Sequence, residues 1–140
     1  MNPQDVLTLF KDSQALLTGH FLLTSGRHSD VYYEKFTLLK NPAICTRICE
    51  AMADKFRTNG VQTVVGPTTG GIIIAYDVAR YLGVESIYAE QGENGRVFKR
   101  GFSLEPGQRV VIVDDVLTTG KSVEEVIRVV SWCKATIGGI

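Results

Sequence analysis

Beyond Gly60, short apolar runs alternate with longer segments in which apolar residues recur every three or four positions. Short apolar runs bounded by turn residues predict strands, and the longer periodic segments predict helices. The predicted strands cover residues 61–66, 84–90, 109–115 and 135–140, and the predicted helices cover residues 70–83 and a segment opened by Ser122. This alternation indicates an α/β fold, with a parallel sheet flanked by helices and joined by right-handed crossovers.

The first forty residues have a less regular pattern. A helix is predicted from about Pro3, and its inward residues are Val6, Leu9, Phe10, Leu16 and Leu17. Residues 21–39 contain two strand-like runs around a polar turn at residues 25–30, which predicts an extended or hairpin-like excursion. We therefore expect a helix-and-strand segment before the sheet.

A further helix is predicted between this segment and the sheet. Asn41 followed by Pro42 is typical of an N-cap and a first helical position. Gly60 is placed to end the helix. One apolar face of this helix is marked by Ile44, Ile48, Met52 and Phe56.

Two features of the second half concern its connections. Ser122 and Glu125 have the spacing of a capping box at the start of the last helix. Residues 91–107 form the one long polar connection, which predicts a short hairpin or a mobile flap.

The bulk numbers fit one globular domain. The chain has 140 residues, enough for a substantial core, and we expect residues 1–140 to form one domain. Its 15 basic and 15 acidic residues give zero net charge, which disfavours binding to nucleic acid or to an anionic membrane. The N-terminus is too polar for a secretory signal, and no apolar run approaches a membrane span.

Cysteine and histidine give little sign of a metal site. Cys45 and Cys49 lie four residues apart on a predicted helix and are either paired ligands or small buried thiols. Burial is favoured because no matching Cys/His pair follows. His20 and His28 also lack metal-ligand spacing. Three cysteines are an odd, low number, so the reducing cytoplasm is the expected compartment.

Two strand-to-helix loops have the composition of anion-binding sites. Residues 66–71 (GPTTGG) and residues 114–122 (DDVLTTGKS) each follow a predicted strand and lead into a helix. In a parallel sheet such loops meet at the carboxyl ends of the strands. Their threonine hydroxyls and free amides at a helix N-terminus suit phosphate, and glycine lets the backbone approach the anion.

The second loop is not a nucleotide P-loop. The first glycine of that motif would have to stand at position 115, which is Asp115, and a carboxylate would repel phosphate oxygens. Asp114 and Asp115 suit instead the hydroxyls of a sugar diol or the water shell of Mg²⁺. A solvated strand end is the plain alternative for this pair. A ligand with a ribose diol, a 5-phosphate and a second phosphate group satisfies both loops, and phosphoribosyl diphosphate has these parts.

The run VVIVDDVLTTGKS, residues 110–122, resembles the phosphoribosyl-diphosphate motif of the type I phosphoribosyltransferases. The segment FLLTSGRHSDVYYEKF, residues 21–36, resembles the region with which orotate phosphoribosyltransferases hold their pyrimidine. The resemblance extends from about Leu16 to the end of the chain. It implies the type I fold, with residues 1–40 as an N-terminal base-binding hood and residues 41–140 as the phosphoribosyl-diphosphate-binding core.

The resemblance also implies roles for individual residues. Asp114 and Asp115 bind the ribose hydroxyls, partly through Mg²⁺, and act in catalysis. The 5-phosphate and the diphosphate are held by Thr118, Thr119, Gly120, Lys121 and Ser122 and by Thr68, Thr69, Gly70 and Gly71, respectively. Orotate is bound by Tyr32, Tyr33 and Thr118, although plain strand packing explains either tyrosine equally well.

The long polar connection corresponds to the mobile catalytic loop of the family, which often reaches into the partner subunit and so implies a homodimer. Arg96 is expected to bind phosphoribosyl diphosphate, and Lys99 and Arg100 are expected to assist catalysis, with a solvated surface flap as the alternative.

The sequence departs from many relatives at several positions. Thr24 and Gly70 stand where lysines are common, and the segment with Arg96, Lys99 and Arg100 replaces a loop rich in lysine and histidine. Ile140 ends the chain early, because the family continues with a strand and a later arginine that anchors the orotate carboxylate. The core is therefore expected to be C-terminally incomplete, and we expect phosphoribosyl diphosphate to bind better than orotate.

The sequence thus predicts a pentosyltransferase of pyrimidine nucleotide biosynthesis. It would join orotate to phosphoribosyl diphosphate, giving orotidine 5′-phosphate and diphosphate. Two alternatives remain open. A purine phosphoribosyltransferase would keep the same phosphate loops, and a non-catalytic regulator would only sense phosphoribosyl diphosphate.

Overall fold

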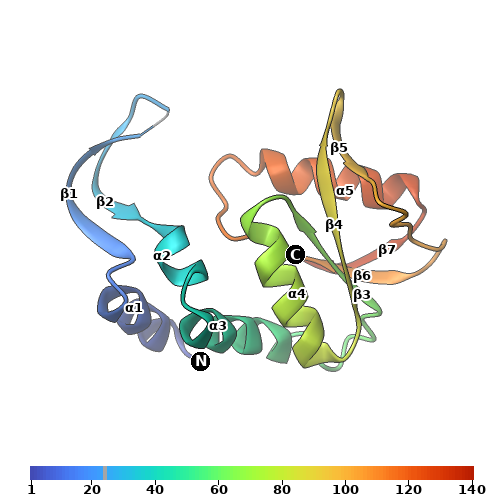
Figure 1. The fold of residues 1–140 in the computed structure, drawn as a ribbon, viewed down its shortest axis with the longest axis horizontal. Coiled ribbons are helices and arrows are strands. Elements are labelled where there is room, and N and C mark those ends of the chain that lie inside the picture. Colours follow the sequence, from blue (N-terminus) through green and yellow to red (C-terminus); the bar gives the residue numbers. More distant parts are fainter. Residues whose placement is uncertain (24) are drawn as a thin grey trace. The chain divides into compact units, whose positions relative to one another are not determined.

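The computed structural model describes residues 1–23 and 25–140, and the chain forms two compact units, Met1–Ile48 and Cys49–Ile140 (Figure 1). Thr24, which departs from the family pattern, lies outside the described residues.

The first unit begins with helix α1 (Pro3–Asp12), which starts where the sequence predicts. Asn2 and Asp5 form a reciprocal capping box, with both hydrogen bonds 2.9 Å long. The prediction that Leu16 and Leu17 extend the inner face of this helix is wrong. The helix ends at Asp12, so both leucines lie in the following strand.

Strands β1 (Leu16–Leu22) and β2 (His28–Tyr33) form an antiparallel hairpin, as predicted. Leu16 pairs with Tyr33 at one end and Leu22 with His28 at the other, and the register shifts between Thr18 and Phe21. A short helix, α2 (Lys35–Leu39), follows inside a segment predicted to be extended. Glu34 caps this helix, because its carboxylate accepts a hydrogen bond from the Phe36 amide at 3.2 Å.

Helix α3 (Pro42–Asp54) begins as predicted and ends earlier. The Asn41 side-chain oxygen accepts hydrogen bonds from the amides of Ala43 and Ile44, at 3.1 and 3.3 Å. The chain leaves the helix after Asp54 and continues in turns to Gly60. Its most buried residues are Cys45, Cys49 and Ala53, and this confirms that the two cysteines are buried thiols.

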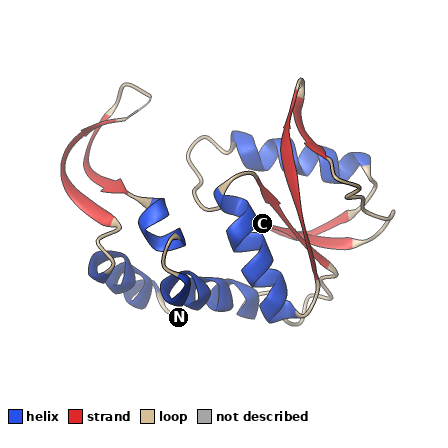
Figure 2. Cartoon of the chain, in the orientation of Figure 1, coloured by secondary structure: helices blue, strands red, loops and turns tan. Residues whose placement is uncertain are grey.

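The second unit is a five-stranded sheet in the order β5-β4-β3-β6-β7 (Figures 1 and 2). The strands are β3 (Thr63–Pro67), β4 (Glu85–Gly92), β5 (Gly95–Phe98), β6 (Arg109–Ile112) and β7 (Thr136–Gly139). The parallel sheet is confirmed for β4, β3, β6 and β7. Strand β5 is antiparallel to β4, so the long polar connection does hold a short hairpin.

Helices α4 (Gly70–Leu82) and α5 (Lys121–Trp132) cover opposite faces of the central strand β3. Val65 belongs to a buried cluster with Val126 and Val130 of α5. Gly66, the next residue, faces the other way, because a Cβ added there would lie 3.0 Å from the Cβ of Ala75 on α4. Both faces of β3 are therefore buried, as in other parallel sheets.

The predicted end of α4 is confirmed, whereas the predicted cap at the start of α5 is wrong. Gly83 ends α4 in the left-handed conformation, with φ of 69°, as predicted. The capping box predicted for Ser122 and Glu125 is wrong: the N-cap of α5 is Gly120, without a side-chain hydrogen bond. The Glu125 carboxylate instead lies beside the cation of Arg96, with 3.8 Å between Oε2 and Nε.

Among the described residues, no helix is both long enough and apolar enough to cross a membrane.

The close approach of β3 and α4 predicts a large effect of Gly66→Ala. The new methyl group would collide with the Gly71 carbonyl, and backbone cannot move aside as a flexible side chain can. We expect the free energy of unfolding to fall by about 3 kcal/mol. In Gly19→Ala the methyl group lies 3.4 Å from the nearest Phe21 carbon, so a change within about 0.5 kcal/mol is expected. Equal losses in urea titrations of the two variants would contradict this account.

Candidate active site

The two loops selected from the sequence meet at one edge of the sheet. Val65 of β3 pairs with Ile112 of β6 in parallel register, and the Val113 amide donates a 2.9 Å hydrogen bond to the Val65 carbonyl. Since parallel strands end at the same edge, residues 68–71 after β3 and residues 113–120 after β6 leave the sheet side by side. These loops lie where the strand order changes direction, the usual ligand position in such sheets.

The loop after β3 presents backbone donors at the start of α4. Thr69 is the N-cap and its side chain makes no capping hydrogen bond, while Gly70 and Gly71 are buried in the first turn. The Thr68–Thr69 peptide bond is cis. A Cβ added to Gly71 would lie 2.7 Å from Pro67 Cδ and 3.4 Å from Asp114 Oδ1, so the loop packs tightly and directly beside the aspartate. The helix start and the nearby carboxylate therefore lie next to each other.

The loop after β6 leads to the start of α5. A small cavity of about 30 Å³ is lined by Asp114 and by residues 116–123, which include the predicted phosphate-binding residues Thr118, Thr119, Gly120, Lys121 and Ser122. Gly120 has φ of 80° and offers no side-chain cap to the first amides of α5, of which that of Lys121 donates a long 3.4 Å hydrogen bond to Thr119 Oγ1. These amides carry the positive end of the helix dipole, which favours an anion.

Asp114 and Asp115 are half-buried at the start of the loop after β6. Asp114 Oδ1 accepts a 2.8 Å hydrogen bond from the Asp115 amide, which orients the first carboxylate. Carboxylates at this position can accept hydrogen bonds from sugar hydroxyls or bind Mg²⁺ directly or through water.

A second cavity of about 290 Å³ lies next to Asp114 and was missed by the sequence analysis. Its wall is mostly apolar and includes Phe56, Ile112 and Leu117, the last with 72% of its surface exposed. Phe56 comes from the segment after α3, far from residues 112–117 in sequence. No local pattern links these residues, so only the fold brings them together.

The three cations of the β4–β5 hairpin lie in different surroundings. Lys99 donates a 3.0 Å hydrogen bond to the Gln91 carbonyl, and Arg100 pairs with Glu90 at 2.6 Å. The hydrogen bond with Glu90 raises the pKa of Arg100 above its ordinary value. Arg96 points into the protein and has a side chain only 9% exposed.

The tyrosines predicted to contact the base lie on β2 in the first unit. Tyr32 and Tyr33 are 42% and 51% exposed, and they pack against Phe21 and Phe10, respectively. Neighbouring strand residues point to opposite faces, so one flat ligand contacts only one of them.

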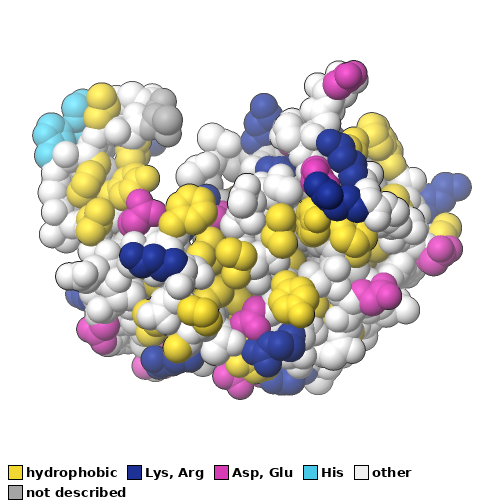
Figure 3. Space-filling view, in the orientation of Figure 1, with side chains coloured by type: hydrophobic (Ala, Val, Ile, Leu, Met, Phe, Trp, Pro, Cys, Tyr) yellow, Lys and Arg dark blue, Asp and Glu magenta, His cyan; other side chains and the backbone are white. Residues whose placement is uncertain are grey.

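A hollow beside the β1–β2 hairpin is lined by His20, His28 and their neighbours. His20 Nε2 and His28 Nδ1 lie 2.6 Å apart across the hairpin, a contact that their sequence spacing did not predict. The two histidines are drawn in cyan in Figure 3. In the described part of the chain, no group of three or more histidine, cysteine or acidic residues is arranged to hold a metal ion.

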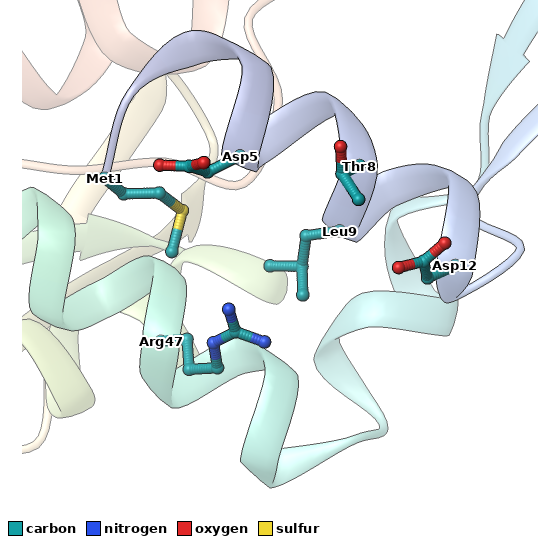
Figure 4. Close-up of a pocket in the computed structure, with 6 residues that line it drawn as sticks. All are labelled: Met1, Asp5, Thr8, Leu9, Asp12 and Arg47. Carbon is teal, nitrogen blue, oxygen red and sulfur yellow. The ribbon is translucent and has the colours of Figure 1, made fainter.

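Another hollow, about 380 Å³, lies between α1 and α3 (Figure 4). Asp5 and Asp12 come from α1 and Arg47 from α3, and all three are exposed. The carboxylate of Asp5 already caps α1. This polar surface groove has no further feature of an active site.

Comparison with known proteins shows the family. The model of the "Phosphoribosyl transferase domain" matches residues 36–138. The chain is 45% identical to the orotate phosphoribosyltransferase of Desulforamulus reducens over 141 residues, with 100% of this chain and 73% of the relative covered. It is 44% identical to the same enzyme of Chlorobaculum parvum, with 100% and 72% covered.

Solved structures agree. The crystal structure of orotate phosphoribosyltransferase from Aeropyrum pernix has a TM-score of 0.75 and 28% identity, with 94% of this chain and 76% of that chain covered. An adenine phosphoribosyltransferase with a TM-score of 0.71 is only 17% identical, which shows the shared fold alone. The chain therefore belongs to the phosphoribosyltransferase family, and within that family it groups with the orotate phosphoribosyltransferases.

Proposed function

We propose that the protein transfers the phosphoribosyl group from phosphoribosyl diphosphate to orotate, giving orotidine 5′-phosphate and diphosphate. The observation that carries this proposal is the meeting of the two loops: a Cβ added to Gly71 would lie 3.4 Å from Asp114 Oδ1. A ligand with phosphates at both ends of a ribose would contact both helix starts and the carboxylates between them. The orotate phosphoribosyltransferases among the relatives support the choice of orotate.

Each part of the site has a proposed role. Residues 118–122 hold the 5-phosphate with the amides and hydroxyls at the start of α5. Asp114 and Asp115 accept hydrogen bonds from the ribose diol. Thr69, Gly70 and Gly71 bind the diphosphate at the start of α4. Tyr32 or Tyr33, together with Thr118, is proposed to contact orotate.

The two half-buried aspartates also suit Mg²⁺, because carboxylate oxygens beside a phosphate ligand are a common Mg²⁺ environment. When bound, Mg²⁺ supplies positive charge against the departing diphosphate. Asp114 and Asp115 are the residues proposed to hold it, partly through substrate and water.

Positioning and charge stabilisation account for the catalysis. Displacement at the anomeric carbon passes through an oxocarbenium-like state, as at other glycosyl centres. The ring nitrogen of orotate attacks, so no protein side chain acts as the nucleophile. The helix starts hold both phosphates while negative charge moves onto the leaving group. Movement of the β4–β5 hairpin would bring Lys99 and Arg100 toward the diphosphate and exclude water.

A homodimer and a cytoplasmic location belong to the same proposal. The hairpin cations would serve a partner subunit if the hairpin reaches across a dimer. Among the described residues, Cys45, Cys49 and Cys133 form no disulfide, which is consistent with a reducing compartment. Basic and acidic side chains are interspersed on the face drawn in Figure 3, which gives no support to a nucleic-acid-binding regulator.

The function is tested by measuring diphosphate release from phosphoribosyl diphosphate with Mg²⁺ present. Release should depend on orotate and should not occur with adenine or hypoxanthine in its place. Equal release with a purine would reject orotate specificity. Binding of nucleic acid in a gel-shift assay would instead support the alternative of a non-catalytic regulator.

Replacement of both Asp114 and Asp115 by Asn is expected to weaken the binding of phosphoribosyl diphosphate roughly 100-fold in Mg²⁺. This estimate takes about 1.5 kcal/mol for each charged hydrogen-bonding group that is lost. The matched control is Asp54→Asn with Asp77→Asn, which removes the same charge from two pairs with nearby arginines. Calorimetric titration of both variants measures the difference. Unchanged affinity in the Asp114/Asp115 variant would overturn the assignment.

Alanine at both Lys99 and Arg100 is expected to lower kcat about 100-fold and to change KM much less, if these cations act in the transition state. Arg128→Ala removes an exposed cation from α5 and serves as the control. In a dimer with shared sites, mixing the Lys99/Arg100 variant with the Asp114/Asp115 variant should restore part of the activity. If steady-state assays of the mixture show no recovered activity, the active sites are not shared between subunits.

A further inference from the structure

Arg96 is bound by the protein rather than presented to a ligand. Its Nη1 donates hydrogen bonds to Thr68 Oγ1 at 2.9 Å and to the Ala89 carbonyl at 3.0 Å. Its Nη2 donates to the Thr68 carbonyl at 3.0 Å. A guanidinium has five donors in a fixed plane, so these bonds hold its position and leave few donors for a substrate.

Three polar groups of Thr68 are held by hydrogen bonds. Its amide donates a 3.0 Å hydrogen bond to the Ala89 carbonyl, and its carbonyl and hydroxyl oxygens both accept from Arg96. Because the hydroxyl oxygen is used as an acceptor, its proton remains to be donated elsewhere. Thr68 immediately precedes the helix start formed by Thr69, Gly70 and Gly71. Its orientation therefore sets that of the loop proposed to bind diphosphate, residues 68–71, here called the diphosphate loop.

Glu125 supplies the counter-charge to Arg96. Its side chain is 11% exposed, its Oε2 lies 3.8 Å from Arg96 Nε, and its Oε1 lies 3.9 Å from Lys121 Nζ. Gly95 closes over the carboxylate, since a Cβ there would lie 3.8 Å from both Cγ and Cδ of Glu125. A buried guanidinium without a counter-ion is unfavourable, so the carboxylate holds Arg96 in its charged, bridging position.

We propose that Glu125 and Arg96 are positioning residues that hold the diphosphate loop from helix α5. Glu125 lies on α5, and Arg96 on β5 reaches past Ala89 of β4 to Thr68, which follows β3. The pair orients the Thr68 hydroxyl and the first amides of α4 for the diphosphate. This inference rests on the proposed function, and it replaces the direct contact with phosphoribosyl diphosphate predicted for Arg96 by an indirect role.

The experiment compares two probes, Mg²⁺-diphosphate and ribose 5-phosphate, by calorimetric titration of the full chain. Glu125→Gln should weaken diphosphate binding about tenfold or more, as is common when the support of a binding group is removed. Ribose 5-phosphate contacts only the other loop, so its affinity should change less than about twofold. Glu124→Gln is the control, because it makes the same substitution at the adjacent, exposed position of α5.

A second variant separates positioning from stability. Replacement of the pair by apolar residues, Arg96→Met with Glu125→Leu, leaves no unpaired charge and often preserves stability. We expect a melting temperature close to that of the unmodified chain, with diphosphate binding still weakened. Normal diphosphate binding in this variant would overturn the inference, since the pair would then be only structural. If the unmodified chain binds neither probe, the proposed function falls, and the inference falls with it.

Discussion

The parallel pairing of β3 with β6 is the constraint on which the site depends. The hydrogen bond from the Val113 amide to the Val65 carbonyl, 2.9 Å long, fixes where β6 ends relative to β3. Asp114 follows at once and arrives beside Gly71. A shift of register by one residue would turn Asp114 toward the other face of the sheet and separate it from the diphosphate loop. The meeting of carboxylate and helix start is therefore a consequence of strand register.

The helices on the two faces of β3 hold this register in place. Val64 and Val65 are both fully buried, one on each face of the strand. A strand covered on both sides cannot slip without exposing apolar surface on one side or burying polar groups on the other. Gly66 adds a steric condition, because only a residue without a side chain lets α4 begin so close to β3. The backbone donors at the start of α4 are thus held ready before any ligand binds.

The sequence was sufficient for features that depend on local pattern. The apolar runs predicted the parallel strands, and Gly83 and Asn41 marked helix ends that the structure confirms. It failed where a residue has a choice of partners distant in sequence. Glu125 has the spacing of a capping residue, yet its carboxylate lies beside Arg96, which β5 brings to it. Likewise, the histidines meet only because the β1–β2 register places them opposite each other, and Phe56 joins the cavity beside Asp114 only through the fold.

The zero net charge of the chain bears on how it can bind a polyanion. The candidate site relies on backbone amides at two helix starts, and the exposed cations of the hairpin are engaged by Gln91 and Glu90. Amides act over hydrogen-bond distances, whereas exposed lysines attract anions over the Debye length, about 8 Å at physiological salt. Gly70 fits this arrangement because it contributes a backbone amide and no charged side chain. Under the proposed function, recognition at this site depends on the fixed geometry of two loops, which strand register and the Arg96–Glu125 pair control.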